Sequence, residues 1–359
     1  MAAVAAFGHP VRWTEAALLM VDIAAGSAPT WWKDATAAPV ALPAVWDVDG
    51  RRVEADVYAP GGRARATLVL APGAAALGRD EPRLIAFAHS LARAGFVVAI
   101  PELPAVRRLA LSRADADILA DTARALKRAA PGLPLGIGAI SYGVGPAVIA
   151  ALDTDMTPRV DFIAGIGGYH NADETIRFVT TGAFRRIGDG RLHRLTPNRY
   201  GRWAFLLANA GRLDSAADAD ALREVARRRG ADPAASIDDL RPALGEDGRA
   251  VLALVENDDA ARVNALLAAL PAGVRESIDG LNLALYDLSK LHARLILVHG
   301  RDDPVIPFSE SEALAAAVPK GAASVHLIER IGHVEFDAVS LANAFAMWSA
   351  VDRLLAERR

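Results

Sequence analysis

Four short runs of apolar residues constrain the fold of this chain more than any other feature. The runs read ATLVL (66–70), FVVAI (96–100), LGIGAI (135–140) and RLILV (294–298). A continuous apolar run of this length is typical of a strand that is buried on both faces of a sheet. Between the first two runs, residues 82–94 show helical spacing of apolar side chains, among them Leu84, Phe87 and Leu91. Alternating strands and helices predict an α/β fold with a mostly parallel central sheet and helices on both faces.

Further predicted elements extend this pattern toward both ends of the chain. A hairpin over 44–59 turns at Asp49-Gly50, a dipeptide that favours a type I′ turn. Helices are predicted over 112–130 and 143–152, and strands over 160–166 and 323–328. The segment Ser309–Glu312 has the pattern of a capping box that opens a helix. The last predicted helix has four apolar residues on one face: Leu341, Phe345, Trp348 and Leu355.

The interval between His170 and Leu291 breaks the alternation of strands and helices. It contains no apolar strand run, but helical patterns occur over 202–213, 217–228, 260–270 and 274–291. Helices inserted between two sheet strands predict a cap folded over one edge of the core. We therefore expect a core formed by 41–169 and 291–359, a helical cap at 170–290, and an N-terminal helical extension at 1–40. Within the extension, residues 14–25 predict an amphipathic helix that packs on the core.

The composition excludes several classes of function. The chain has 359 residues, is 52% hydrophobic, has a net charge of -3 and contains no cysteine. Without cysteine, disulfides, zinc-thiolate sites and a thiol nucleophile are excluded. The charge pattern shows no basic run that would bind nucleic acid, and the apolar stretch 16–26 is too short to span a membrane. With no nucleotide-binding motif and no cluster of metal ligands, we expect no cofactor and no metal, and a small-molecule substrate. Because no signal peptide or membrane span is recognisable, we expect a cytoplasmic location.

Ser141 lies where the third apolar run changes abruptly into a helical pattern. The local sequence is Ala139-Ile140-Ser141-Tyr142-Gly143, with a small residue two positions before the serine and another two positions after it. Small residues at these positions let a strand turn sharply into a helix and expose the serine Oγ at the carboxyl edge of the sheet. This arrangement is a nucleophile elbow, with Ala139 in place of the more usual glycine.

The ends of two later strands carry the groups that a serine nucleophile requires. An imidazole must take the proton of the hydroxyl, and a carboxylate must hold that imidazole in one tautomer. The run RLILV is followed by HGRDDPVIP (299–307), and the strand SVHLI is followed by ERIGH (329–333). His333 is therefore the candidate base, and both Asp302 and Asp303 are candidates for the acid.

The order Ser…Asp…His at three predicted strand ends resembles the α/β-hydrolase superfamily. Its acid loop commonly reads His-Gly-x-x-Asp-x-x-Ile-Pro, and its histidine commonly follows a glycine; the resemblance covers about 41–169 and 291–359. It implies that Ser141 is the nucleophile, Asp303 the orienting acid and His333 the general base. Pro304 also favours Asp303, because it restricts the preceding backbone to an extended conformation. We expect His299 to brace the acid loop through hydrogen bonds.

The resemblance also implies an oxyanion hole and a reaction class. One backbone donor is expected from Tyr142, directly after the nucleophile, and the other from Ala74, with Ala75 as the alternative. The expected reaction is hydrolysis of a carboxylic ester through an acyl-enzyme. Acyl transfer, amide or peptide hydrolysis by the same triad, and a non-catalytic binding module are the alternatives. The cap is expected to supply an apolar acyl site, and its aromatic residues either line that site or pack within the cap: Tyr169, Phe178, Phe184, Trp203 and Phe205.

Overall fold

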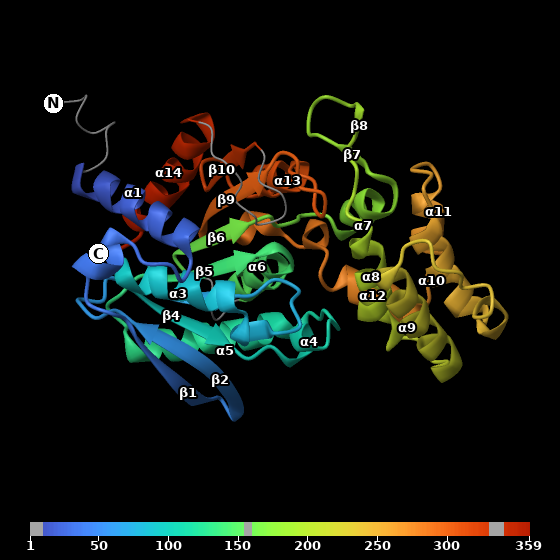
Figure 1. Cartoon of the computed structure of the whole chain (residues 1–359), viewed down its shortest axis with the longest axis horizontal. Helices are drawn as coiled ribbons and strands as arrows, with labels where there is room; N and C mark the ends of the chain where they lie inside the picture. The colour runs from blue at the N-terminus through green and yellow to red at the C-terminus, as the bar shows by residue number, and fades with distance from the viewer. Residues whose placement is uncertain (1–9, 154–159, 330–340) are drawn as a thin grey trace.

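An eight-stranded sheet forms the centre of the computed structural model, which describes residues 10–153, 160–329 and 341–359. The strand order is β1-β2-β4-β3-β5-β6-β9-β10 (Figure 1). Neighbouring strands are parallel except for the pairs β1–β2 and β2–β4. The predicted α/β fold with a mostly parallel sheet is therefore confirmed. The strands are β1 (Val40–Val48), β2 (Arg51–Ala59), β3 (Ala66–Ala71), β4 (Phe96–Pro101), β5 (Leu135–Ile140), β6 (Phe162–Ile166), β9 (Arg294–Gly300) and β10 (Ala323–Ile328).

The first two strands form the hairpin that the sequence predicts. Val48 pairs with Arg51, so that the turn contains only Asp49 and Gly50. Both turn residues have positive φ, 55° for Asp49 and 81° for Gly50. Two successive left-handed residues define a type I′ turn, whose twist matches that of the two strands.

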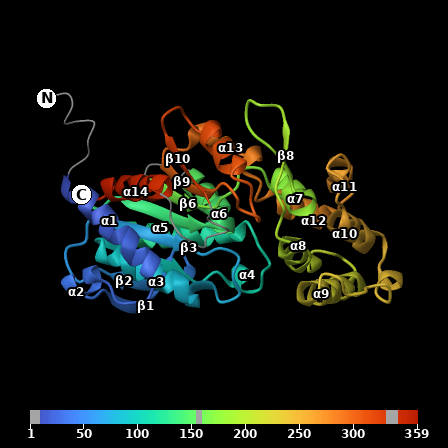
Figure 2. The same cartoon turned by 45° about the horizontal axis from the view of Figure 1, so that its top comes forward.

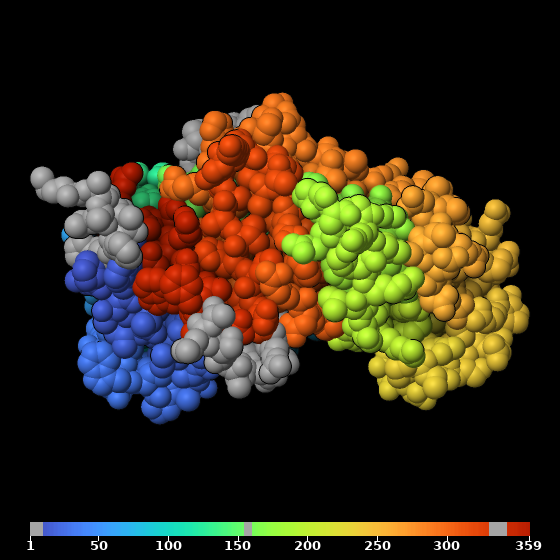
Figure 3. Space-filling view, turned by 90° about the horizontal axis from the view of Figure 1, so that it is seen from above, coloured from blue at the N-terminus to red at the C-terminus, as the bar shows by residue number. Residues whose placement is uncertain are grey.

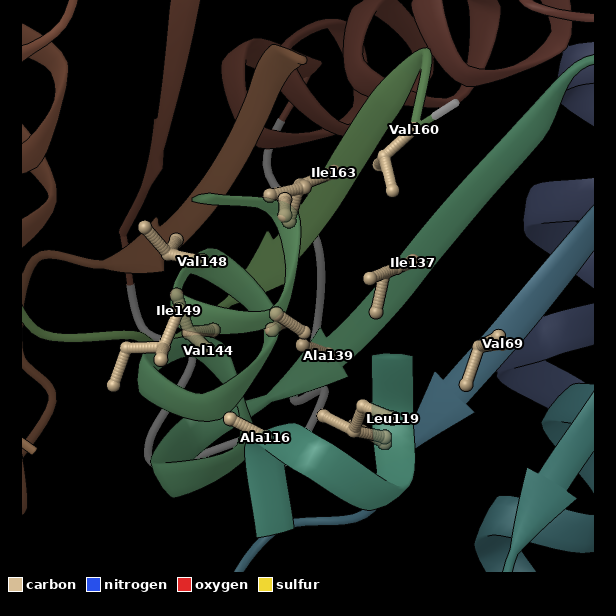
Figure 4. Packing of buried hydrophobic residues seen from close by; sticks show 14 of the residues in the cluster. Val69, Ala116, Leu119, Ile137, Ala139, Val144, Val148, Ile149, Val160 and Ile163 are labelled. Atoms are coloured by element: carbon tan, nitrogen blue, oxygen red, sulfur yellow. The ribbon is translucent and has the colours of Figure 1, made fainter. Parts of the chain in front are cut away.

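Helices cover both faces of the sheet, and each face has its own apolar core. On one face lie α5 (Ala114–Ala129), α6 (Val144–Leu152) and α13 (Ser309–Ala317), with Leu119, Ile137 and Val148 in the core (Figure 4). On the other face lie α1 (Pro10–Ala25), α3 (Pro82–Arg93) and α14 (Leu341–Ala356). Leu91 and Phe162 belong to this second core. The sheet is thus the middle of three layers. Because helices cover both faces, functional side chains are expected on the loops at the carboxyl edge of the strands.

Helix α1 packs on the core, as its amphipathic pattern predicts. It lies against α14 and α3, and α2 (Trp31–Ala35) follows it (Figure 2). Arg12 pairs with Asp352 of α14 at 2.6 Å, and the rings of Trp13 and Trp348 meet edge to face at 5.6 Å. The N-terminal helix therefore closes the same face of the sheet as the C-terminal helix.

The chain between β6 and β9, called the cap below, forms one end of the molecule (Figures 1 and 3). Its helices share a core of their own, in which Leu206, Leu222 and Val251 are buried. It also contains a two-stranded ribbon, β7–β8, that the sequence did not predict, because each strand has only three residues. The cap elements are α7 (Ala172–Thr181), β7 (Ala183–Arg185), β8 (Leu192–Arg194), α8 (Tyr200–Ala210), α9 (Ala216–Ala231), α10 (Glu246–Glu256), α11 (Val263–Ala268) and α12 (Ala272–Asp279).

Two local predictions are wrong. The helix predicted over 274–291 ends at Asp279, since Gly280 follows and the chain then makes short 3₁₀ turns. The capping box predicted at Ser309–Glu312 is not formed: Phe308 is the N-cap, and Glu312 pairs with Arg186 at 2.8 Å. On the last helix, Phe345 is 67% exposed and its ring lies beside that of Trp348, so the predicted apolar face is not buried along its whole length.

Among the described residues, no helix has the combination of length and hydropathy that is needed to cross a bilayer.

Candidate active site

Ser141 occupies a strained turn at the carboxyl end of β5. The strand ends at Ile140, Ser141–Gly143 form a single 3₁₀ turn, and α6 begins at Val144. The φ angle of Ser141 is 52°, in the left-handed region that residues with a Cβ avoid. Within the described part of the chain, only Asp49, Leu109 and Ser141 have this backbone conformation without being glycine. Such strain persists only where the surroundings enforce it, so Ser141 is a candidate functional position.

The loop after β3 lies directly against this turn. A Cβ added to Gly143 would lie 2.6 Å from the carbonyl oxygen of Pro72, and one added to Gly73 would lie 3.5 Å from Cβ of Ser141. This closeness explains why small residues are needed at the turn. It also brings the segment that begins Pro72-Gly73-Ala74 beside the serine, where the predicted oxyanion donors, the N–H groups of Tyr142 and Ala74, are expected.

Gly143→Ala is expected to lower kcat by roughly 10²–10³, about the effect of losing one oxyanion donor. The added methyl meets the backbone oxygen of Pro72, so the loop that carries Ala74 must move away from Ser141. Gly132→Ala is the matched control, since nothing lies within 4 Å of a Cβ at that position. Steady-state kinetics on a p-nitrophenyl ester measure both variants, and an unchanged kcat for Gly143→Ala would contradict this placement of the loop.

The side chain of Tyr142 anchors the turn to the start of α5. Its hydroxyl lies 2.7 Å from Asp115 Oδ2 and 2.9 Å from the carbonyl oxygen of Ser112, and it accepts a hydrogen bond from the N–H of Ser112. Burial raises the pKa of Tyr142 well above 10, and burial also raises the pKa of Asp115. Arg212 of the cap donates to the carbonyl oxygen of Leu111 in the same loop. Tyr142, the residue after the candidate nucleophile, is therefore held by core residues in a loop that the cap also contacts.

Asp303 lies in the loop that follows β9 and is 2% exposed. Its Oδ1 accepts hydrogen bonds from the N–H groups of Val305 and Ile306 at 2.7 and 3.1 Å. Asp302, the alternative acid, is exposed to solvent. A buried carboxylate with one oxygen held by the backbone suits the orienting role better than a solvated one, so the geometry favours Asp303 over Asp302.

His299 braces the acid loop through both ring nitrogens. Nε2 lies 2.9 Å from the carbonyl oxygen of Ile306 and 3.4 Å from Oδ2 of Asp303, and Nδ1 lies 2.7 Å from Oγ of Ser311. A carbonyl oxygen only accepts, so Nε2 donates to Ile306. This agrees with the bracing role expected for His299.

The predicted base, His333, lies outside the described residues. Its place in the chain follows β10, whose last residue, Ile328, pairs in register with Gly300 of β9. The N–H of Arg301 also donates to the carbonyl oxygen of Ile328 at 2.8 Å. The strand that precedes His333 and the strand that precedes Asp303 therefore end side by side. The pairing of His333 with Asp303 stays a prediction.

A second buried carboxylate, Glu310, connects the core to the beginning of the cap. Its Oε2 accepts hydrogen bonds from the N–H groups of His170 and Asn171, at 3.0 and 2.6 Å. Burial raises the pKa of Glu310 to about 7, although the two hydrogen bonds act in the other direction and lower it. The end of the cap reaches the same point, because the N–H of Ala284 donates to the carbonyl oxygen of His170 at 3.1 Å.

Glu310→Gln is expected to change how stability depends on pH. Because the pKa of Glu310 rises from 4.5 to about 7 on folding, the folded protein binds this proton more tightly than the unfolded chain. The resulting stability is present at low pH and decreases as the pH rises from about 4.5 to about 7, by at most roughly 3 kcal/mol. The glutamine variant does not titrate, so its Tm relative to wild type should increase between about pH 5 and about pH 8.

The matched control for this prediction is Glu312→Gln, in the same helix. Its carboxylate pairs with Arg186 and is partly exposed, so its Tm difference from wild type should be similar at the two pH values. Parallel Tm profiles for wild type and Glu310→Gln, measured by thermal unfolding, would show that Glu310 is ionised in the folded protein throughout this range.

The aromatic residues considered for the acyl site pack against other side chains of the cap or of the core. Trp203 belongs to the cap core, with Phe205 packed against it, and Phe178 and Phe184 form a cluster with Phe308, the N-cap of α13. Tyr169 is buried against α6, where its hydroxyl fills the space beside Gly145. Of the two roles considered for these side chains, the structure therefore supports packing. In the described residues, no group of three or more histidine, aspartate or glutamate side chains is arranged to hold a metal ion.

Solved structures of several hydrolases resemble this chain. A putative hydrolase from Legionella pneumophila superposes with a TM-score of 0.54 at 15% identity, covering 96% of this chain and 95% of that one. Dienelactone hydrolase from Anabaena variabilis gives a TM-score of 0.44 at 14% identity over 88% of this chain and 96% of that one. Acylaminoacyl peptidase from Pyrococcus horikoshii gives 0.48 at 10% identity and covers 89% of this chain, which spans only 41% of that peptidase. No family model matches the chain, and no curated protein matches it in sequence.

The Legionella structure matches nearly the whole of both chains, so it bears on the entire architecture rather than on one part. The sheet order and the sharp turn at Ser141 between β5 and α6 agree with the superfamily that the sequence motifs resemble. The chain therefore has the α/β-hydrolase fold.

Proposed function

We propose that this protein is a serine hydrolase that cleaves a carboxylic ester through an acyl-enzyme. Ser141 is the nucleophile, His333 the general base and Asp303 the orienting acid. The backbone N–H groups of Tyr142 and Ala74 form the oxyanion hole. The observation that carries the proposal is the left-handed backbone of Ser141 at the carboxyl edge of the sheet, with φ at 52°.

In the proposed reaction, Oγ of Ser141 attacks the ester carbonyl carbon while His333 takes the hydroxyl proton. The carbonyl oxygen becomes an oxyanion that the two backbone N–H groups stabilise. His333 then gives the proton to the leaving alkoxide, which departs as the alcohol and leaves the acyl group on Ser141. Water attacks the acyl-enzyme in the same way, which releases the acid and restores the serine.

A substrate screen tests this proposal. We expect the purified protein to hydrolyse p-nitrophenyl esters faster than aminoacyl anilides, with a burst of p-nitrophenol equal to the enzyme concentration. If anilides are the better substrates, the same triad serves amide hydrolysis instead. If added alcohol accepts the acyl group in preference to water, the protein is an acyltransferase. If it releases no product from either class and fluorophosphonate does not label it, the chain is a non-catalytic binding module.

A further inference from the structure

An apolar cavity of about 100 Å³ lies between the sheet and the helices α1, α3 and α14. The central strands β3, β5, β6 and β9 form one wall, and the three helices form the other. Among the described residues, those lining this cavity come from the core and from helix α1 of the N-terminal extension, and none come from the cap. Such a void is unusual, because protein interiors leave few spaces larger than a water molecule.

The cavity exists because two adjacent strands carry small residues at the same level. Across the sheet, Leu70, Gly138, Ala164 and Ile296 stand in register, so that a glycine and an alanine lie between two large side chains. One level deeper the gap is closed, since the ring of Phe162 occupies the space beside Gly136, within 2.2 Å of an added Cβ. The helical wall opposite is also small where Ala350 faces the cavity. The sequence thus leaves a space at one level only.

Solvent exposure of the strand residues increases from the level of the cavity toward the edge of the sheet where Ser141 lies. Ile140, Ile166 and Val298 stand in register at the last level of the strands, and all three are partly exposed. Ala164, one level deeper, is still partly exposed, whereas Phe162 and Ile296 are buried. Accessibility therefore decreases from the carboxyl edge inward, and Ser141 directly follows the outermost residue of β5.

We propose that this cavity receives the acyl chain of the substrate, which is therefore an ester of a straight-chain aliphatic acid of medium length. The inference rests on the proposed function. The walls are almost entirely hydrocarbon, so they suit a ligand segment without polar atoms. Met20 and Met347, whose side chains adapt to irregular ligands, also line the cavity. Gly138 lies three residues before Ser141, about 10 Å along a strand, so only an acyl chain long enough to span that distance reaches the cavity.

The test fills the cavity from either wall with Ala164→Leu and, separately, Ala350→Leu. Ala17→Leu is the matched control, because it makes the same change on the exposed face of α1. The measurement is kcat/KM on p-nitrophenyl acetate, butyrate, octanoate and decanoate. For the wild type and the control we expect an increase of about fourfold per methylene that enters the cavity. Both filled variants should keep the acetate rate within about twofold and lose most of the increase, a loss of more than about tenfold on octanoate.

Two results would overturn the inference. Filled variants that unfold at a higher temperature and keep the wild-type chain-length profile would show that the cavity is only a packing void. Equal rates of the wild type on acetate and octanoate would show that no acyl chain enters it. Failure of the proposed function is distinguishable, because it removes Ser141-dependent hydrolysis of acetate as well. In that case, calorimetric titration with decanoate supports the cavity as a hydrocarbon site if the wild type binds and the filled variants do not, and overturns it otherwise.

Discussion

Replacing Ser141 by alanine is expected to abolish ester hydrolysis and fluorophosphonate labelling while the protein stays folded. The change removes one hydroxyl from a residue that is 8% exposed, and it leaves the backbone turn and its neighbours unaltered. Loss of the nucleophile in a serine hydrolase lowers kcat by up to about 10⁶. Steady-state kinetics on p-nitrophenyl acetate and labelling of the purified variant measure the effect.

Ser141→Gly is a useful companion to this variant, since glycine adopts positive φ without strain. It should be as inactive as Ser141→Ala. Its free energy of unfolding should exceed that of Ser141→Ala by about 1 kcal/mol, because glycine relieves the backbone strain at φ 52°. Continued labelling of both variants would mean that another serine performs the chemistry. A glycine variant less stable than the alanine variant would mean that the turn is not strained.

Asp303→Asn is expected to lower kcat by roughly 10⁴, because an amide cannot hold the imidazole in the required tautomer. The variant should fold, since Oδ1 of asparagine can still accept the hydrogen bonds that Val305 and Ile306 donate to Asp303. Asp302→Asn should cost about tenfold or less, because that side chain is exposed and shapes only the loop. The two variants differ by one position in the chain and therefore serve as controls for each other.

Both variants should be compared at one pH, with circular dichroism and Tm recorded to verify that each is folded. If Asp302→Asn proves the more damaging change in folded protein, the acid of the triad is Asp302. Equal and small effects of both would mean that neither carboxylate orients the base.

Much of the fold follows from the sequence because it is encoded locally. ATLVL, FVVAI and LGIGAI each form a strand almost residue for residue, since a continuous apolar run is stable only where both faces are covered. The elbow at Ser141 is equally local, because the small residues that permit the sharp turn are within two positions of the serine. The choice of Asp303 over Asp302, which rests on Pro304 and the family motif, stays a prediction, although the structure adds that Asp303 is buried and Asp302 exposed.

Other features depend on contacts between distant segments, which no local pattern reveals. Tyr142 meets Asp115, 27 residues earlier, and Glu310 meets His170, 140 residues earlier. Glu310 lies inside the predicted capping box, because Ser309 and Glu312 have the spacing of that motif. Its carboxylate instead accepts hydrogen bonds from the first residues of the cap. The cavity is hidden for a related reason: Gly138 and Ala164 are unremarkable singly, and only the register of β5 and β6 places them side by side.

The meeting of the two ends of the cap at His170 has a consequence for how this architecture can vary. The N–H of Ala284 donates to His170, and Oδ1 of Asn282 accepts from the N–H of Ala172, so the chain leaves the core and re-enters it at one place. A segment whose ends are adjacent can be lengthened, shortened or exchanged without moving the strands on either side. A short linker in place of the α7–α12 segment would therefore close the chain without stretching β6 or β9. The helical segment can therefore change in sequence and length independently of the core.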